Sequence, residues 1–97
     1  MALTTTEQRA AEMLAGMIDY RNATATARTI HPRDIRKREE ATRAAGEVAG
    51  YRAALIIALP PTDYARIDRE ADRIVAAIRA DVARLAHANR AALAASN

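Results

Sequence analysis

The sequence predicts an all-α protein, an elongated antiparallel bundle of three helices in a single domain, residues 1–97. Three observations lead to this fold class. Helix-favouring Ala, Leu, Arg and Glu are abundant in a chain that has no Phe, no Trp and only three Gly. Apolar residues recur at three- and four-residue steps through most of the chain, the period of an amphipathic helix. Prolines at positions 32, 60 and 61 divide the chain into three segments.

The first helix is expected to begin at residue 4 and to end between residues 22 and 28. Thr4 stands three residues before Glu7, the spacing of a capping box at a helix start. Beyond Tyr20, Asn and repeated Thr lower the helix propensity, so the helix should fray or end between Asn22 and Ile30. Its predicted buried stripe consists of Ala10, Met13, Leu14, Met17, Tyr20 and Thr24.

The second helix is expected over residues 32–59. Pro32 favours the first helical turn and moves the residue before it out of the α region, so His31 is the expected cap. Pro60 and Pro61 end the helix because proline lacks the backbone donor. The short connection favours an antiparallel hairpin of the second and third helices, with the first helix laid alongside.

Two apolar stripes on the second helix predict two sets of neighbours. Each helix of an isolated three-helix bundle needs only one broad apolar face, so one of these stripes should remain for a partner. The first stripe consists of Ile35, Thr42, Ala45, Ala49, Ala53 and Ile56, and the second of Ala41, Ala44, Val48, Tyr51, Leu55 and Ala58.

The third helix is expected over residues 62–94 and has the clearest apolar stripe of the chain. At ~1.5 Å per residue it would extend about 48 Å, which is longer than either preceding helix can cover. Its C-terminal part should therefore be left over. The stripe consists of Tyr64, Ile67, Ala71, Ile74, Val75, Ile78, Val82, Leu85, Ala86 and Leu93.

Groups that could support catalysis are few. The chain has no Cys, and its two histidines, His31 and His87, fall at a predicted cap and opposite the buried stripe of the third helix. Asp68 and Asp72 are one turn apart, where pairing with nearby Arg explains them. We therefore expect no enzyme, no catalytic, cofactor-binding or metal-binding residues, and no small-molecule substrate.

The sequence also indicates a cytoplasmic, soluble protein. Its first residues have neither a basic start nor an apolar stretch long enough for export. The longest strongly apolar run, residues 53–59, is far shorter than the ~20 residues that a membrane helix needs. We expect no membrane partner.

The second helix carries the predicted partner-binding site. Gly46 and Gly50 lie four residues apart in its interior, and each costs up to ~1 kcal/mol relative to Ala, so close approach of another helix is the expected reason. We expect a protein–protein interaction module, most simply a homodimer. Its size and lack of cofactor motifs would also suit a phage or mobile-element accessory protein that inhibits a host complex. The predicted contact residues are Gly46, Val48, Ala49, Gly50, Tyr51 and Leu55.

A basic segment over residues 28–43 gives the alternative function, binding of nucleic acid. Its surplus of three positive charges equals the net charge of the whole chain, +3. Cations in the first turns of a helix oppose the helix dipole, and such a local conflict is typical of functional sites. The segment would attract phosphates, an acidic protein surface, or only water. Its basic residues are Arg28, Arg33, Arg36, Lys37, Arg38 and Arg43.

Overall fold

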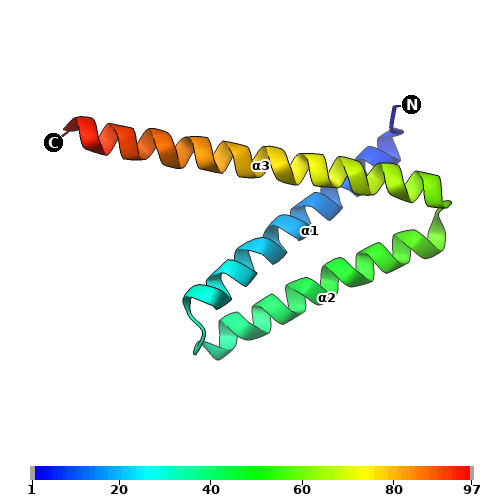
Figure 1. Cartoon of the computed structure of the whole chain (residues 1–97). Helices are drawn as coiled ribbons and strands as arrows, with labels where there is room; N and C mark the ends of the chain where they lie inside the picture. The colour runs from blue at the N-terminus through cyan, green and yellow to red at the C-terminus, as the bar shows by residue number, and fades with distance from the viewer. Residues whose placement is uncertain (1, 97) are drawn as a thin grey trace.

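The computed structural model describes residues 2–96 and confirms the elongated three-helix architecture. The helices are α1 (Thr5–Ile30), α2 (Ile35–Ala58) and α3 (Pro61–Ser96), and this range contains no strand. In Figure 1, α1 and α2 form an antiparallel hairpin and α3 crosses α1. The radius of gyration is 16.9 Å, whereas a compact domain of this length has about 12.5 Å. The molecule measures 56 × 36 × 15 Å and is therefore flat and extended.

The central helix of the bundle is α1, which packs extensively against both α2 and α3. The prediction that the second and third helices form a hairpin is wrong, because α2 and α3 contact each other little. They converge at their connection and diverge away from it (Figure 1). Leu59 is extended at φ −120°, ψ 151°, as the residue before a proline must be, so the chain leaves α2 at an angle.

The core takes one large fully buried side chain from each helix: Leu14, Val48 and Ile67. Buried alanines, including Ala15 and Ala71, allow the helix backbones to approach closely. Every helix therefore contributes to one thin core.

The buried face of α1 differs from the predicted stripe. Met13 and Tyr20 are 58% and 48% exposed, whereas Ala11, Ala15 and Ile18 are buried. The physical reason is that α1 lies between two helices, so its contact face is centred between the two neighbours. Leu14 and Thr24 are buried as predicted.

The start of α1 is the predicted capping box. The backbone N–H of Thr4 donates to Glu7 Oε1 at 2.9 Å, and that of Glu7 donates to Thr4 Oγ1 at 3.1 Å. The helix continues to Ile30, past the expected end between residues 22 and 28. Along its last turns the hydroxyls of Thr26 and Thr29 donate to carbonyl oxygens four residues back, which satisfies the polar groups without ending the helix.

The start of α2 is later than predicted. The expected cap at His31 is wrong, because Asp34 caps α2 and accepts the backbone N–H of Lys37 at 3.2 Å. His31 instead closes α1 by donating its N–H to the carbonyl of Ala27. Asp is a stronger N-cap than His, so Pro32 falls in the turn between the helices.

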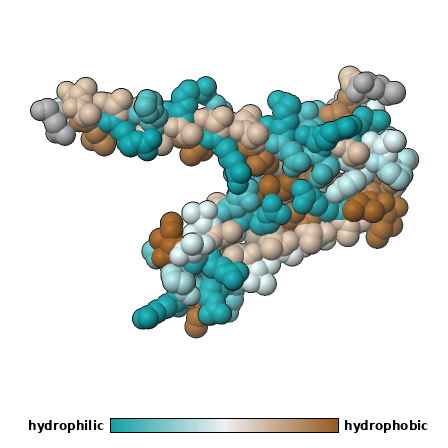
Figure 2. All heavy atoms as spheres, in the orientation of Figure 1, coloured by the Kyte–Doolittle hydropathy of each residue, from teal (hydrophilic) through white to brown (hydrophobic). Residues whose placement is uncertain are grey.

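The C-terminal half of α3 projects from the rest of the molecule. We call residues 79–96 the arm and residues 5–78 the body. The arm is about 27 Å long at 1.5 Å per residue. Val82, Leu85 and Leu93 in it are 61%, 63% and 67% exposed. Figure 2 shows hydrophobic surface on the underside of the arm, facing the open angle between α3 and the α1–α2 hairpin.

Candidate protein interaction surfaces

One of the two stripes of α2 is covered by the fold and the other is open. Ala41, Ala44 and Val48 are buried, and Tyr51 and Leu55 pack partly buried against the core. Every member of the opposite stripe is exposed. The prediction that a single copy leaves one stripe of this helix uncovered is therefore confirmed. The open members are Ile35, Thr42, Ala45, Ala49, Ala53 and Ile56.

The predicted contact residues divide between these two sides. Gly46, Ala49 and Gly50 lie on the exposed side, and a Cβ added at either glycine would meet no atom within 4 Å. Val48 is 1% exposed, so it belongs to the core and we remove it from the contact surface. We define the outer face of α2 as Ala45, Gly46, Ala49, Gly50, Ala53 and Ile56.

The C-terminal end of α2 extends this outer face with larger apolar side chains. Ile56 is 57% exposed and Ile57 is 86% exposed, just before the proline connection. Small residues at the centre of the face leave the backbone accessible, and the isoleucines add apolar area at one end. Such a surface suits another helix better than a small ligand.

The basic segment forms a groove between the end of α1 and the start of α2. Arg28, Arg38 and Arg43 line it together with exposed Ile35. The carboxylate of Glu39 lies in the same lining and reduces its positive charge. Arg33, Arg36 and Lys37 are not part of this lining. The sequence grouped all six basic residues, but only the fold of the α1–α2 turn shows that Arg28, Arg38 and Arg43 share one groove.

Ion pairs join the helices within the body. The Arg66 guanidinium lies 3.0 Å from Glu7 of α1 and 2.7 Å from Asp63. The backbone hydrogen bond from Thr4 and the bond from Arg66 lower the pKa of Glu7, and Glu7 raises the pKa of Arg66. Arg52 of α2 lies 3.3 Å from Asp68 of α3. These charges hold helices together and do not converge on a reactive group.

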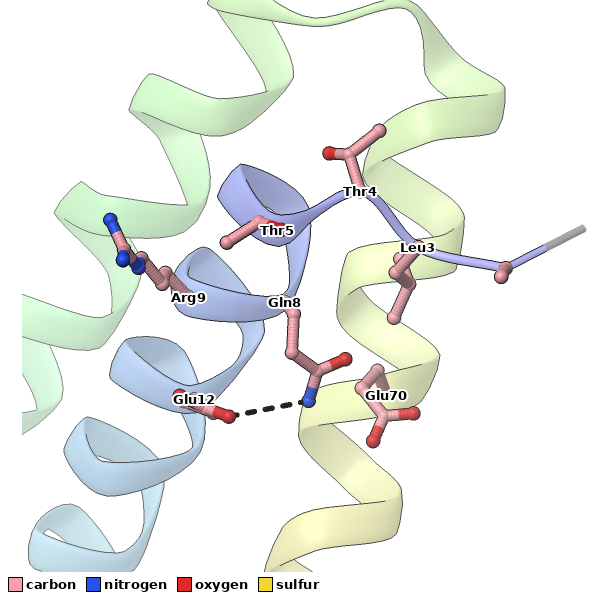
Figure 3. Close-up of a pocket in the computed structure, with 8 residues that line it drawn as sticks. Leu3, Thr4, Thr5, Gln8, Arg9, Glu12 and Glu70 are labelled. Carbon is pink, nitrogen blue, oxygen red and sulfur yellow. Dashed lines mark hydrogen bonds between the residues drawn. The ribbon is translucent and has the colours of Figure 1, made fainter.

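A shallow pocket at the start of α1 contains two further carboxylates (Figure 3). The amide of Gln8 donates to Glu12 at 3.4 Å. Glu70 accepts hydrogen bonds from Arg73, which lower the pKa of its carboxyl group. Each of these carboxylates has a partner within the chain, so the pocket presents no free acid–base pair.

Other chemical sites are sparse in the part of the chain that the structure describes. Over residues 2–96, no three His, Asp or Glu side chains are grouped as a metal ion would require. His31 and His87 are both exposed. Among the same residues, no helix is both long and apolar enough to cross a lipid bilayer.

Comparison of the chain with protein-family models, with curated proteins and with solved structures finds no match.

Proposed function

We propose that the chain is a non-enzymatic protein–protein interaction module that self-associates and presents the outer face of α2 to a protein partner. One observation carries the proposal: after folding, Ala45, Ala49 and Ile56 remain exposed while the opposite side of α2 is buried. Helices with two apolar sides are typically covered on both. A small phage or mobile-element protein that inhibits a host complex would use such a face.

The total surface of a single copy supports this proposal. The accessible area is 7054 Å², whereas a compact monomer of 10.5 kDa exposes about 5,400 Å². An average stable interface takes about 800 Å² from each partner. The accessible area that one copy has beyond that of a compact monomer is therefore large enough to supply an interface without opening the core.

The outer face of α2 also suits a helical partner in detail. Gly46 and Gly50 have open space where a side chain would lie, and each Gly costs folding stability of up to ~1 kcal/mol in a helix interior. Close approach by a partner helix would offset that cost through backbone and side-chain packing.

Light scattering and a matched pair of variants test the proposal. We expect the wild-type mass to exceed one copy and to persist in added salt, because apolar packing is not screened. Gly50→Leu should prevent capture of a specific protein from the native host, since it fills the open face. Gly16→Leu is the matched control, because Gly16 is also exposed with no atom within 4 Å of an added Cβ. A strict monomer that captures nothing would contradict the proposal.

The second candidate function is binding of nucleic acid through the basic groove. Arg28, Arg38 and Arg43 surround this groove from two helices, an arrangement that would contact adjacent phosphates. The logarithm of the affinity for a duplex should then fall linearly, with a steep slope, as the logarithm of the salt concentration rises. Arg38→Gln should reduce that slope, whereas Arg90→Gln in the arm should leave it unchanged.

A further inference from the structure

The apolar stripe of α3 continues past the body as a regular heptad pattern. Ala71 and Val75 are its first members and are buried in the body core beside Ile18 of α1. Later members are open, including Val82 and Leu85. Alternating steps of four and three residues are the spacing of a seam between two helices. The complete series is Ala71, Val75, Ile78, Val82, Leu85, Asn89, Ala92 and Ser96, which is apolar except at Asn89 and Ser96.

We propose that a second copy of this chain covers the arm, with the two arms packed antiparallel and centred at the level of residue 87. The inference rests on the proposed self-association and names the surface and direction of the contact. The heptad steps then place Ile78 opposite Ser96, Val82 opposite Ala92, and Leu85 opposite Asn89 of the second copy. Larger residues face smaller ones in each pair of positions, so the side chains interdigitate.

The position of α1 selects the antiparallel direction. In a parallel pair, the second α3 would run back along the first past Val75 and Ala71, where α1 already packs. The second copy would bring its own α1 to the same place, and the two α3 helices would be forced apart. In an antiparallel pair the two bodies lie at opposite ends of the paired arms, so each α1 keeps its contacts.

A groove beside the arm receives the far part of the second copy's arm. It lies between α1 and α3 and is lined by Asn22, Ala23 and Thr26 on one side and by Ile78 and Val82 on the other. The antiparallel register brings residues 92–96 of the second copy alongside Ile78 and Val82. That segment is small-sided apart from Leu93, so it fits between two helices without displacing them.

The charges that flank the seam accommodate this register. Asp81 faces Ala95 of the second copy and is already paired with Arg84 of its own helix. Arg79 faces Leu93 of the second copy, whose side chain can pack along the aliphatic part of the arginine. No two like charges come together across the seam, so nothing electrostatic opposes the contact.

The first test places charges in the seam. In wild-type protein, light scattering over a broad concentration range should show a monomer–dimer equilibrium. The double variant Val82→Asp, Leu85→Asp should raise the dissociation constant at least about 100-fold, because it would bury uncompensated carboxylates. Ala80→Asp with Ala91→Asp is the matched control, since it adds the same charge to the opposite side of the arm and should leave the equilibrium unchanged. The helical circular dichroism of a dilute sample checks that each variant folds.

The second test reads the direction of the helices from cross-linking. The chain has no Cys, so single-cysteine variants are unambiguous. Val82→Cys alone and Ala92→Cys alone should remain uncross-linked under oxidising conditions, because each residue lies about 15 Å along the seam from its own copy. A mixture of the two variants should form a covalent dimer. Cross-linking of Ala92→Cys with itself would indicate a parallel pair and would overturn the proposal.

Two further outcomes separate this inference from the proposed function. A dimer that survives Val82→Asp, Leu85→Asp but is lost in Gly50→Leu overturns the arm contact and keeps the interaction module. A wild-type protein that is monomeric at every concentration overturns the arm contact directly, and specific capture of a host protein would then still support the α2 face.

Discussion

The two halves of α3, one in the body and one in the arm, carry a single apolar stripe in opposite surroundings. Ile67 and Ala71 in the body half of α3 are fully buried, whereas Leu85 and Leu93 in the arm are nearly two-thirds exposed. The two halves have the same helical period and similar apolar residues. The difference is that α1 covers only the first half. A hydrophobic pattern thus identifies which residues favour burial, and the lengths of the neighbouring helices decide which of them are buried within one chain.

Truncation of a large core side chain should give the largest effect and the sharpest contrast. Leu14→Ala should lower the free energy of unfolding by about 2–5 kcal/mol, because Leu14 is fully buried between the helices. Leu93→Ala removes the same atoms from the arm and should change the stability of a dilute monomer by no more than about 0.5 kcal/mol. Urea denaturation measures both. Equal losses of unfolding free energy in the two variants would show that the arm belongs to the cooperative core.

The sequence predicted the helices well and their arrangement less well. The apolar stripes, the capping box at Thr4 and the prolines each depend on neighbours within a few residues, so they can be recognised from sequence. The crossing of α3 over α1 depends on the extended turn at Leu59, and contacts across the fold determine that geometry. The same limit applies to Val48, because contacts between helices decide which stripe of α2 faces inward.

The candidate surfaces also divide into features that the sequence shows and features that only the fold shows. Gly46 and Gly50 could be recognised from sequence, because a glycine in a helix interior requires a reason wherever the helix lies. The basic segment could also be recognised, but the separation of Arg28, Arg38 and Arg43 from Arg33, Arg36 and Lys37 could not, since it depends on the path of the α1–α2 turn. Pro32 predicts a cap at His31, whereas the stronger capping side chain of Asp34 begins the helix two residues after the proline.

Removal of the cap of α2 should have the next largest effect and should be confined to the body. Asp34→Ala should lower the free energy of unfolding by about 1 kcal/mol, since it leaves the N–H of Lys37 without its acceptor. Asp34→Asn keeps a capping oxygen and should recover most of this loss. A loss in Asp34→Asn as large as that in Asp34→Ala would assign the effect to charge and not to capping.

Substitution of the open glycines should stabilise the body. Gly50→Ala should raise the free energy of unfolding of the monomer by about 0.5–1 kcal/mol, because the added Cβ meets no atom within 4 Å. Gly16→Ala, in α1, should give a similar gain. The two variants should differ only in partner binding, which Gly50→Ala should weaken. A loss of stability in Gly50→Ala would mean that this part of α2 is already packed against another chain.

Acid should weaken the contact between the starts of α1 and α3 before it affects the arm. Hydrogen bonds from the Thr4 backbone and from Arg66 hold the pKa of Glu7 below its ordinary value. A carboxyl group with a lowered pKa in the folded state adds stability that is present above its unfolded pKa, about 4.3, and lost as the pH falls through the folded value.

We therefore expect the urea midpoint of the wild-type protein to fall as the pH is lowered below about 4, the range in which an unperturbed glutamate becomes protonated. Glu70 beside Arg73 contributes a fall of the same sign. Glu7→Gln should have a lower urea midpoint near neutral pH and a shallower decline of the midpoint in acid. Glu47→Gln, at an exposed site of α2, should match the wild type near neutral pH and in acid. A Glu7→Gln curve parallel to that of the wild type would show that the Glu7–Arg66 pair does not join these helices in solution. Among the residues that the structure describes, no ion pair joins the arm to α1, so this acid effect should be confined to the body.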